Sequence, residues 1–105
     1  MIRTLTTAAI VAASTLPALA DGKTSVQAVV GMRMAYIECG LVAPNGFAVN
    51  TVYEALEYST SNGVGADKFS EGVIRAAHLL AEQHKKEGTM GRFCANMARI
   101  YERAE

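Results

Sequence analysis

The chain has little of almost everything that marks a common function class. It contains no tryptophan, two prolines, two cysteines and two histidines, and its ten lysine and arginine residues balance its ten aspartate and glutamate residues. A near-neutral chain lacks the excess of positive charge that is typical of proteins that bind nucleic acid or an anionic membrane. No Cys-x-x-Cys pair for thiol exchange or haem attachment is present, and no glycine-rich loop has the lysine spacing of a phosphate site. We therefore expect no nucleic-acid partner and no cofactor.

The first twenty residues have the pattern of a secretory signal peptide. A short basic start precedes an apolar stretch over residues 5–16, and residues 18–20 (Ala-Leu-Ala) have the small-x-small form that signal peptidase cleaves. The apolar stretch is too short to span a bilayer. We expect cleavage between Ala20 and Asp21, one mature domain over residues 21–105, no membrane insertion after cleavage, and a periplasmic location, with secretion as the alternative.

Export would place the two cysteines, Cys39 and Cys94, in an oxidising compartment. With two cysteines the pairing has no alternative within one chain, and a closed loop of this length contributes about 4 kcal/mol on the chain-entropy model. A mature domain this small has a thin core, so a covalent cross-link would supply a substantial part of its stability. The sequence predicts an intramolecular disulfide, with a free thiol, an intermolecular bridge or a metal site as alternatives.

Apolar residues at helical spacing predict four helices, at residues 23–41, 47–58, 67–87 and 90–104. In the first, Thr24 or Ser25 is the expected cap, Gly40 the expected stop, and Gly31 a point where another helix could approach closely. Its expected inner face is Val26, Val29, Val30, Met34, Ile37 and Leu41.

The second segment is the least helical of the four, because residues 49–53 contain three β-branched side chains; Asn50 is a candidate cap for a late start. For the third helix we expect a cap at Asp67 and a stop at Gly88, and for the fourth a cap at Thr89. The expected inner faces are Phe69, Val73, Ala76, Ala77, Leu80 and His84 in the third helix, and Phe93, Cys94, Met97, Ile100 and Tyr101 in the fourth. The predicted fold is all-α, a small compact bundle of about four helices stapled by one disulfide.

Sulfur-bearing side chains provide the candidate metal site. Met90, Cys94 and Met97 share one helical face, and soft sulfur ligands of this kind select Cu(I). Methionine is also an ordinary core filler, and a disulfide would remove the thiol. The interpretation we favour is that these side chains belong to a core or an interface, with a Cu(I) site as the alternative.

Neither the histidines nor the carboxylates predict catalysis. His78 and His84 lie six residues apart, which places them about 120° apart around a helix; we expect one to face solvent and one to lie at the edge of the core. Glu54 and Glu57 stand side by side, as residues of a solvated face often do. The sequence therefore predicts a protein that is not an enzyme.

In general plan the chain is similar to the small periplasmic acid-stress chaperones, as an exported helical chain with one long-range disulfide. The likeness is architectural, and the residues around Cys39 and Cys94 carry no family signature. Our first hypothesis is an exported accessory module that binds another protein or a second copy of itself. A periplasmic acid or stress chaperone and a Cu(I) carrier are the alternatives.

Overall fold

The computed structural model of the protein describes residues 22–105, and the predicted signal peptide with its cleavage site at Ala20 and Asp21 lies outside the described residues. The described part is helical: α2 (Gly22–Met34), a π-helical turn η2 (Ala35–Cys39), α3 (Asn45–Ser61), α4 (Ala66–Glu87) and α5 (Met90–Ala104). Cys39 and Cys94 form a disulfide. The predicted all-α fold of four helices and one disulfide is confirmed.

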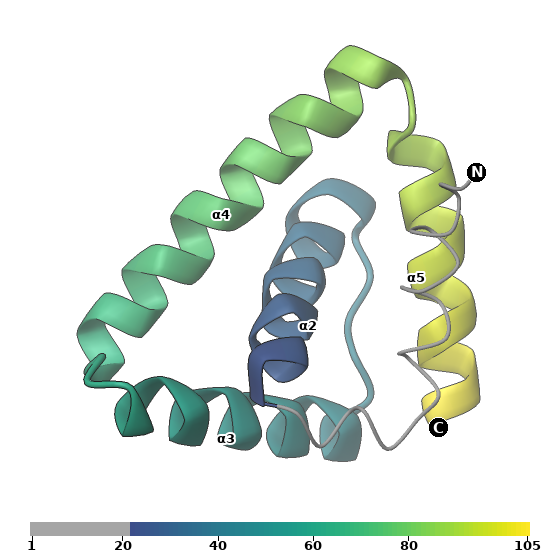
Figure 1. The fold of residues 1–105 in the computed structure, drawn as a ribbon. Coiled ribbons are helices and arrows are strands. Elements are labelled where there is room, and N and C mark those ends of the chain that lie inside the picture. Colours follow the sequence, from purple (N-terminus) through teal and green to yellow (C-terminus); the bar gives the residue numbers. More distant parts are fainter. Residues whose placement is uncertain (1–21) are drawn as a thin grey trace, which may run out of the picture.

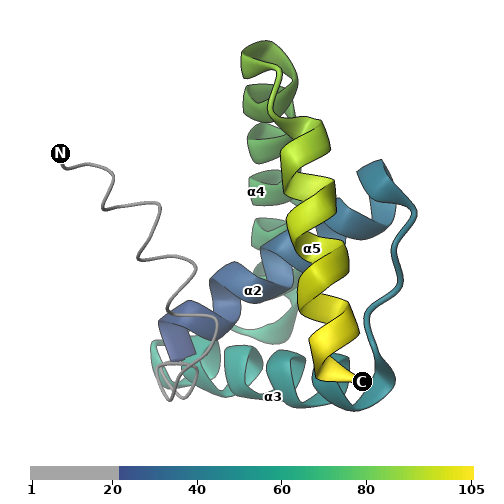
Figure 2. The ribbon, with the colours of Figure 1, turned by 90° about the vertical axis from the view of Figure 1, so that its right-hand side faces the viewer.

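Three of the helices form a triangular frame. In Figure 1 α3, α4 and α5 lie along its three sides, and α2 crosses its interior. Figure 2 shows that α2 crosses obliquely, so that η2 emerges on the opposite side of the frame from the start of α2. The disulfide then joins the end of this crossing helix to α5.

The core is divided into two small clusters. The first core cluster, where α2, α3 and α4 meet, consists of Val29, Ala55, Phe69 and Val73. The second core cluster, where the end of α2 meets α4, consists of Met34, Ala77 and Ala81, with Met90 and Phe93 of α5 packed against it. The buried residues of α4 recur every four positions, as expected for one helical face. Ala76, which we expected on this face, is exposed, and Leu80 and His84 are half-buried.

Glycine ends two helices where the sequence predicts it. Gly40 and Gly88 have φ values of 69° and 72°, and the left-handed conformation favours glycine over residues with a Cβ. By contrast, the cap at Asp67 is wrong, because α4 begins earlier and Gly65 holds the cap position. Thr89 does hold the cap position of α5, but its side chain makes no capping hydrogen bond there.

The start of α2 also differs from the prediction. This helix already includes Gly22, so neither Thr24 nor Ser25 caps it. The Ser25 hydroxyl instead lies buried and donates a hydrogen bond to Glu54 Oε1 at 2.9 Å, which joins α2 to α3. Gly31 is not a point of close helix approach, because a Cβ built on it would meet no atom within 4 Å.

The β-branched residues of the second segment do not delay its helix. α3 begins at Asn45, directly after Pro44, so the late start at Asn50 is wrong. The Ala48 amide donates to the Pro44 carbonyl at 2.9 Å, and the Thr51 hydroxyl donates to the Phe47 carbonyl at 2.7 Å. A threonine that bonds back to the preceding turn in this way is accommodated within a helix.

Candidate functional site

The turn η2 is the local feature on which the disulfide depends. Residues five apart in an α-helix are offset by about 140° around the axis, whereas π-helical bonding brings them close to one face. Met34 and Cys39 are five apart, and Met34 is only 1% exposed and packs in the second core cluster. The π-turn therefore carries Cys39 to the side on which α5 lies, with a Cα–Cα distance of 5.6 Å to Cys94.

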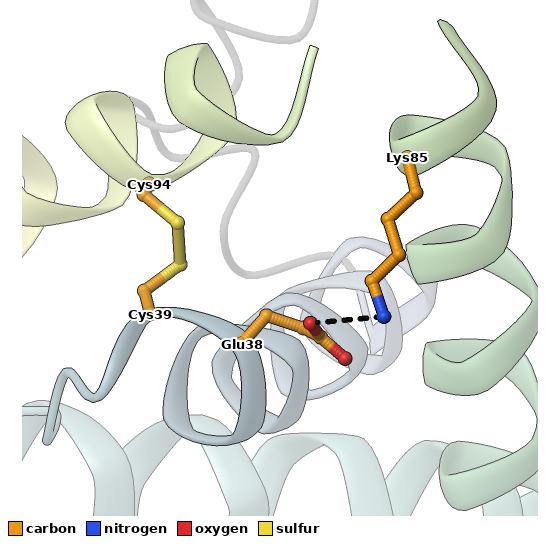
Figure 3. Close-up of a disulfide and its surroundings, with 4 residues drawn as sticks. All are labelled: Glu38, Cys39, Lys85 and Cys94. Atoms are coloured by element: carbon orange, nitrogen blue, oxygen red, sulfur yellow. Dashed lines mark ion pairs between the residues drawn. A yellow bond between two sulfur atoms is a disulfide. The ribbon is translucent and has the colours of Figure 1, made fainter. Parts of the chain in front are cut away.

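Two adjacent residues of η2 tie it to two different helices. Figure 3 shows Cys39 bonded to Cys94 on α5 while Glu38 reaches toward Lys85 on α4. The Glu38 Oε1 to Lys85 Nζ distance is 3.3 Å. Because the lysine is about half exposed, this ion pair stabilises the fold by at most about 1 kcal/mol. The covalent bond is thus the dominant tie at this corner.

The same turn exposes apolar side chains. Ile37, expected on the inner face, is 56% exposed, because the wide turn shifts the positions after Met34 around the axis. It belongs to a larger set of big apolar residues that are more than a third exposed. The members of this set are Tyr36, Ile37, Val42, Val49, Tyr53, Tyr58, Val64, Ile74 and Leu79.

On α3 two members of this set are neighbours. Val49 and Tyr53 are one helical turn apart and are 50% and 71% exposed, so their side chains adjoin. We call this pair the α3 face. Tyrosine combines a large apolar body with a polar tip and is enriched at protein interfaces. The α3 face is therefore the best-defined candidate contact surface among the described residues.

A shallow apolar groove lies between α2 and the first half of α4. Its volume is about 280 Å³, and residues of α2, α3, α4 and the α3–α4 loop line it. Val26, Val30, Phe69 and Val73 contribute apolar walls, whereas Ser59 and Lys68 contribute the polar groups. The helical spacing of apolar residues in α2 and α4 is recognisable in the sequence, but their meeting along a groove depends on the crossing of the two helices.

The histidines occupy the two environments that we expected. His78 is exposed, and His84 is half-buried at the corner between α4 and α5. There its Nδ1 lies 2.6 Å from the Thr89 hydroxyl oxygen, and its ring centroid lies 5.3 Å from that of Phe93. These contacts stabilise the corner and leave no pair of histidines facing one ion.

The soft-metal candidates all lie on α5, but the disulfide removes one of their ligands. Met90 packs against the second core cluster, Met97 is half-buried on α5, and Cys94 is taken up by the disulfide. Met32 and Met34 join different core clusters. Within residues 22–105 no group of three or more His, Cys, Asp or Glu side chains lies close enough to hold a metal ion.

The Tyr101 hydroxyl is buried and has no partner among the described residues. The Tyr101 side chain is 5% exposed, and its hydroxyl makes no hydrogen bond within the described part of the chain. Its ring meets Phe47 edge-on with centroids 6.1 Å apart, which joins the end of α5 to the start of α3. Burial raises the pKa of the Tyr101 phenol above its ordinary value of 10.0. The sequence places Tyr101 on the inner face but gives no signal that its hydroxyl is unpaired.

Two further observations bear on function. None of the helices described over residues 22–105 has the length and apolar character needed to cross a bilayer. Comparisons with family models, with curated proteins and with solved structures find no match to this chain. The function must therefore follow from the chemistry of the described residues.

Proposed function

We propose that this chain is a small exported, non-enzymatic helical protein that acts by binding another protein through the α3 face. The observation that carries the proposal is the set of large apolar side chains left exposed on so small a domain. Exposed apolar surface of this kind marks contact sites when it is contiguous. The α3 face, Val49 and Tyr53, is where two such side chains adjoin.

Export is the part of the proposal that the disulfide supports. Disulfides persist in oxidising compartments and are rare in the cytosol, where thiols are kept reduced. The Cys39–Cys94 bond thus agrees with the signal-peptide pattern in the sequence. The periplasm is the location we propose, with secretion as the alternative.

A pair of double variants tests the contact surface. Val49→Ser with Tyr53→Ser removes the α3 face. Ile74→Ser with Leu79→Ser removes two side chains of α4 that are also at least half exposed, as a matched control. Each protein, with its melting temperature checked, is used as bait in an exported protein fraction and analysed by sedimentation. We expect one partner, or a second copy of the chain, to be bound by the wild type and the control and lost from the α3-face variant.

Two results would contradict the proposal. A wild-type protein that is monomeric and captures no partner would refute binding as its function. Equal capture by both double variants would show that the partner contacts a surface other than the α3 face. In either case, melting temperatures well above the temperature of the assay exclude unfolding as the cause.

A periplasmic chaperone is the second candidate, and the same exposed side chains favour it. A chaperone would bind many unrelated unfolded clients through its apolar side chains, whereas an accessory module would bind one folded partner. Light scattering of an aggregating client between about pH 2 and pH 5 separates the two, because acid loosening of a thin core would expose further apolar surface. Absence of protection throughout this range would discard the chaperone.

A Cu(I) carrier finds less support. With Cys94 in the disulfide, Met90 and Met97 would have to bind the ion through thioethers alone. An anaerobic Cu(I) titration against a chelator of moderate affinity tests this alternative. Failure to compete with the chelator would remove it.

A further inference from the structure

The groove between α2 and α4 contains two polar groups without partners in an otherwise apolar lining. The first is Ser59, which is 8% exposed and whose hydroxyl makes no hydrogen bond to any residue of 22–105. The next two residues behave differently, since the hydroxyls of Thr60 and Ser61 each donate to the carbonyl four positions earlier at 2.8 Å. Ser59 thus lines the groove with its hydrogen-bonding capacity unused.

The second polar group is Lys68, the ionisable side chain in the lining of the groove. Lys85, on the same helix, is paired with Glu38, but Lys68 has no ion pair within the described residues. Asp67 and Glu71 are near it in sequence on α4, but neither forms one of the ion pairs of the described residues with it. The ammonium group of Lys68 is consequently available to an anionic ligand at the rim of the groove.

We propose that this groove binds a small monocarboxylate with an apolar body, an activity separate from the binding proposed for the α3 face. The carboxylate would accept hydrogen bonds from the Lys68 ammonium and the Ser59 hydroxyl, and the apolar body would contact the valine and phenylalanine walls. Ammonium–carboxylate hydrogen bonds are about twice as strong as neutral ones. A volume of about 280 Å³ is just below the usual size of ligand pockets, which selects a short body such as that of a medium-chain fatty acid.

The absence of a side chain at Gly72 keeps the groove open. Gly72 lines it, and a Cβ built there would meet no atom within 4 Å. A larger residue at this position would therefore enter the groove without a clash of its Cβ. Because glycine is a poor residue for a helix interior, such a substitution does not lower helix propensity. Gly72→Leu is thus a variant that fills the groove and keeps the fold.

The test is titration of the purified protein, disulfide intact, with octanoate, followed by backbone amide NMR and calorimetry. Octanol supplies the same tail without the charge, and acetate supplies the headgroup without the tail. We expect octanoate to shift the amides around the groove, and acetate to shift none. Octanol should bind at least about tenfold more weakly than octanoate, the difference that a charge-assisted hydrogen bond supports.

Two variants and two controls locate the site. Lys68→Met should weaken octanoate about tenfold and leave octanol unchanged, whereas Lys86→Met, on the same helix and outside the lining, should change neither. Gly72→Leu should abolish both, and Gly91→Leu on α5 should abolish neither. Octanoate binding that survives Gly72→Leu, equal affinity for octanol and octanoate in the wild type, or no amide shift at millimolar octanoate would each overturn the proposal.

Discussion

The unpaired hydroxyl of Tyr101 permits a prediction with an unusual sign, because Tyr101→Phe should stabilise the protein. A buried polar group without a partner costs about 1–3 kcal/mol, since it loses its hydrogen bonds to water on folding. Phenylalanine removes that group and keeps the ring that meets Phe47 edge-on. For a domain of this size, each 1 kcal/mol shifts the melting temperature by about 4–8 °C. We therefore expect a rise of at least about 4 °C.

The assay is thermal unfolding followed by circular dichroism, with urea unfolding as a second measure. Tyr53→Phe is the matched control, since Tyr53 is 71% exposed and its hydroxyl stays hydrated in the folded state; it should change stability by less than about 0.5 kcal/mol. A lower melting temperature for Tyr101→Phe would refute the reasoning, because it would mean that the hydroxyl contributes favourably to the fold.

The pH dependence of this difference provides an independent check. Burial raises the pKa of Tyr101 above 10.0 in the folded protein, whereas the unfolded chain ionises near that value. The unfolding free energy of the wild type is therefore unaffected by this group below pH 10, and it falls as the pH rises through the folded pKa. The advantage of Tyr101→Phe over the wild type should therefore widen between about pH 9 and pH 11. A constant difference across this range would contradict the assignment of the raised pKa to this residue.

Three further predictions concern stability. Replacing both cysteines by serine should lower the unfolding free energy by about 4 kcal/mol, because the disulfide closes a loop over 55 positions. Urea unfolding measures this loss, and a loss below about 1 kcal/mol would show that α5 is held by packing. Gly72→Ala should stabilise the protein by about 0.5–1 kcal/mol, whereas Gly88→Ala should destabilise it because Gly88 has a positive φ. Equal effects of the two substitutions would contradict the assigned backbone conformations. Ser25→Ala should cost about 1 kcal/mol because Glu54 loses its donor, and the double variant with Glu54→Gln should show whether the two residues are coupled.

The features of the fold that follow from local rules could be predicted from the sequence. The helical spacing of apolar residues gives four helices, and Gly40 and Gly88 end two of them because left-handed backbone favours glycine. The pairing of Cys39 with Cys94 follows because the chain has two cysteines. These inferences need no knowledge of how the helices pack.

The features that depend on packing could not be predicted. The π-turn changes the phase of the first helix after Met34, so Ile37, on the inner face by α-helical spacing, becomes exposed. Ser25 has the composition of a cap, but its hydroxyl reaches Glu54 on another helix instead. The groove and the unpaired Tyr101 hydroxyl likewise arise from contacts between elements far apart in the chain. The α-helical spacing of apolar residues in the sequence carries no information on these contacts.

The small size of the domain relates the disulfide to the exposed apolar side chains. A helix that is held by burial alone needs its apolar residues in the core. In α5, however, Tyr101 is the buried inner-face residue and the others are only half-buried. The Cys39–Cys94 bond holds α5 at its first turns, and the Tyr101–Phe47 contact holds it near its end. Because a covalent bond supplies part of the stability that burial would otherwise supply, Val49, Tyr53 and the other exposed apolar residues are not needed inside. A small domain fixed in this way can keep apolar side chains exposed without losing its fold.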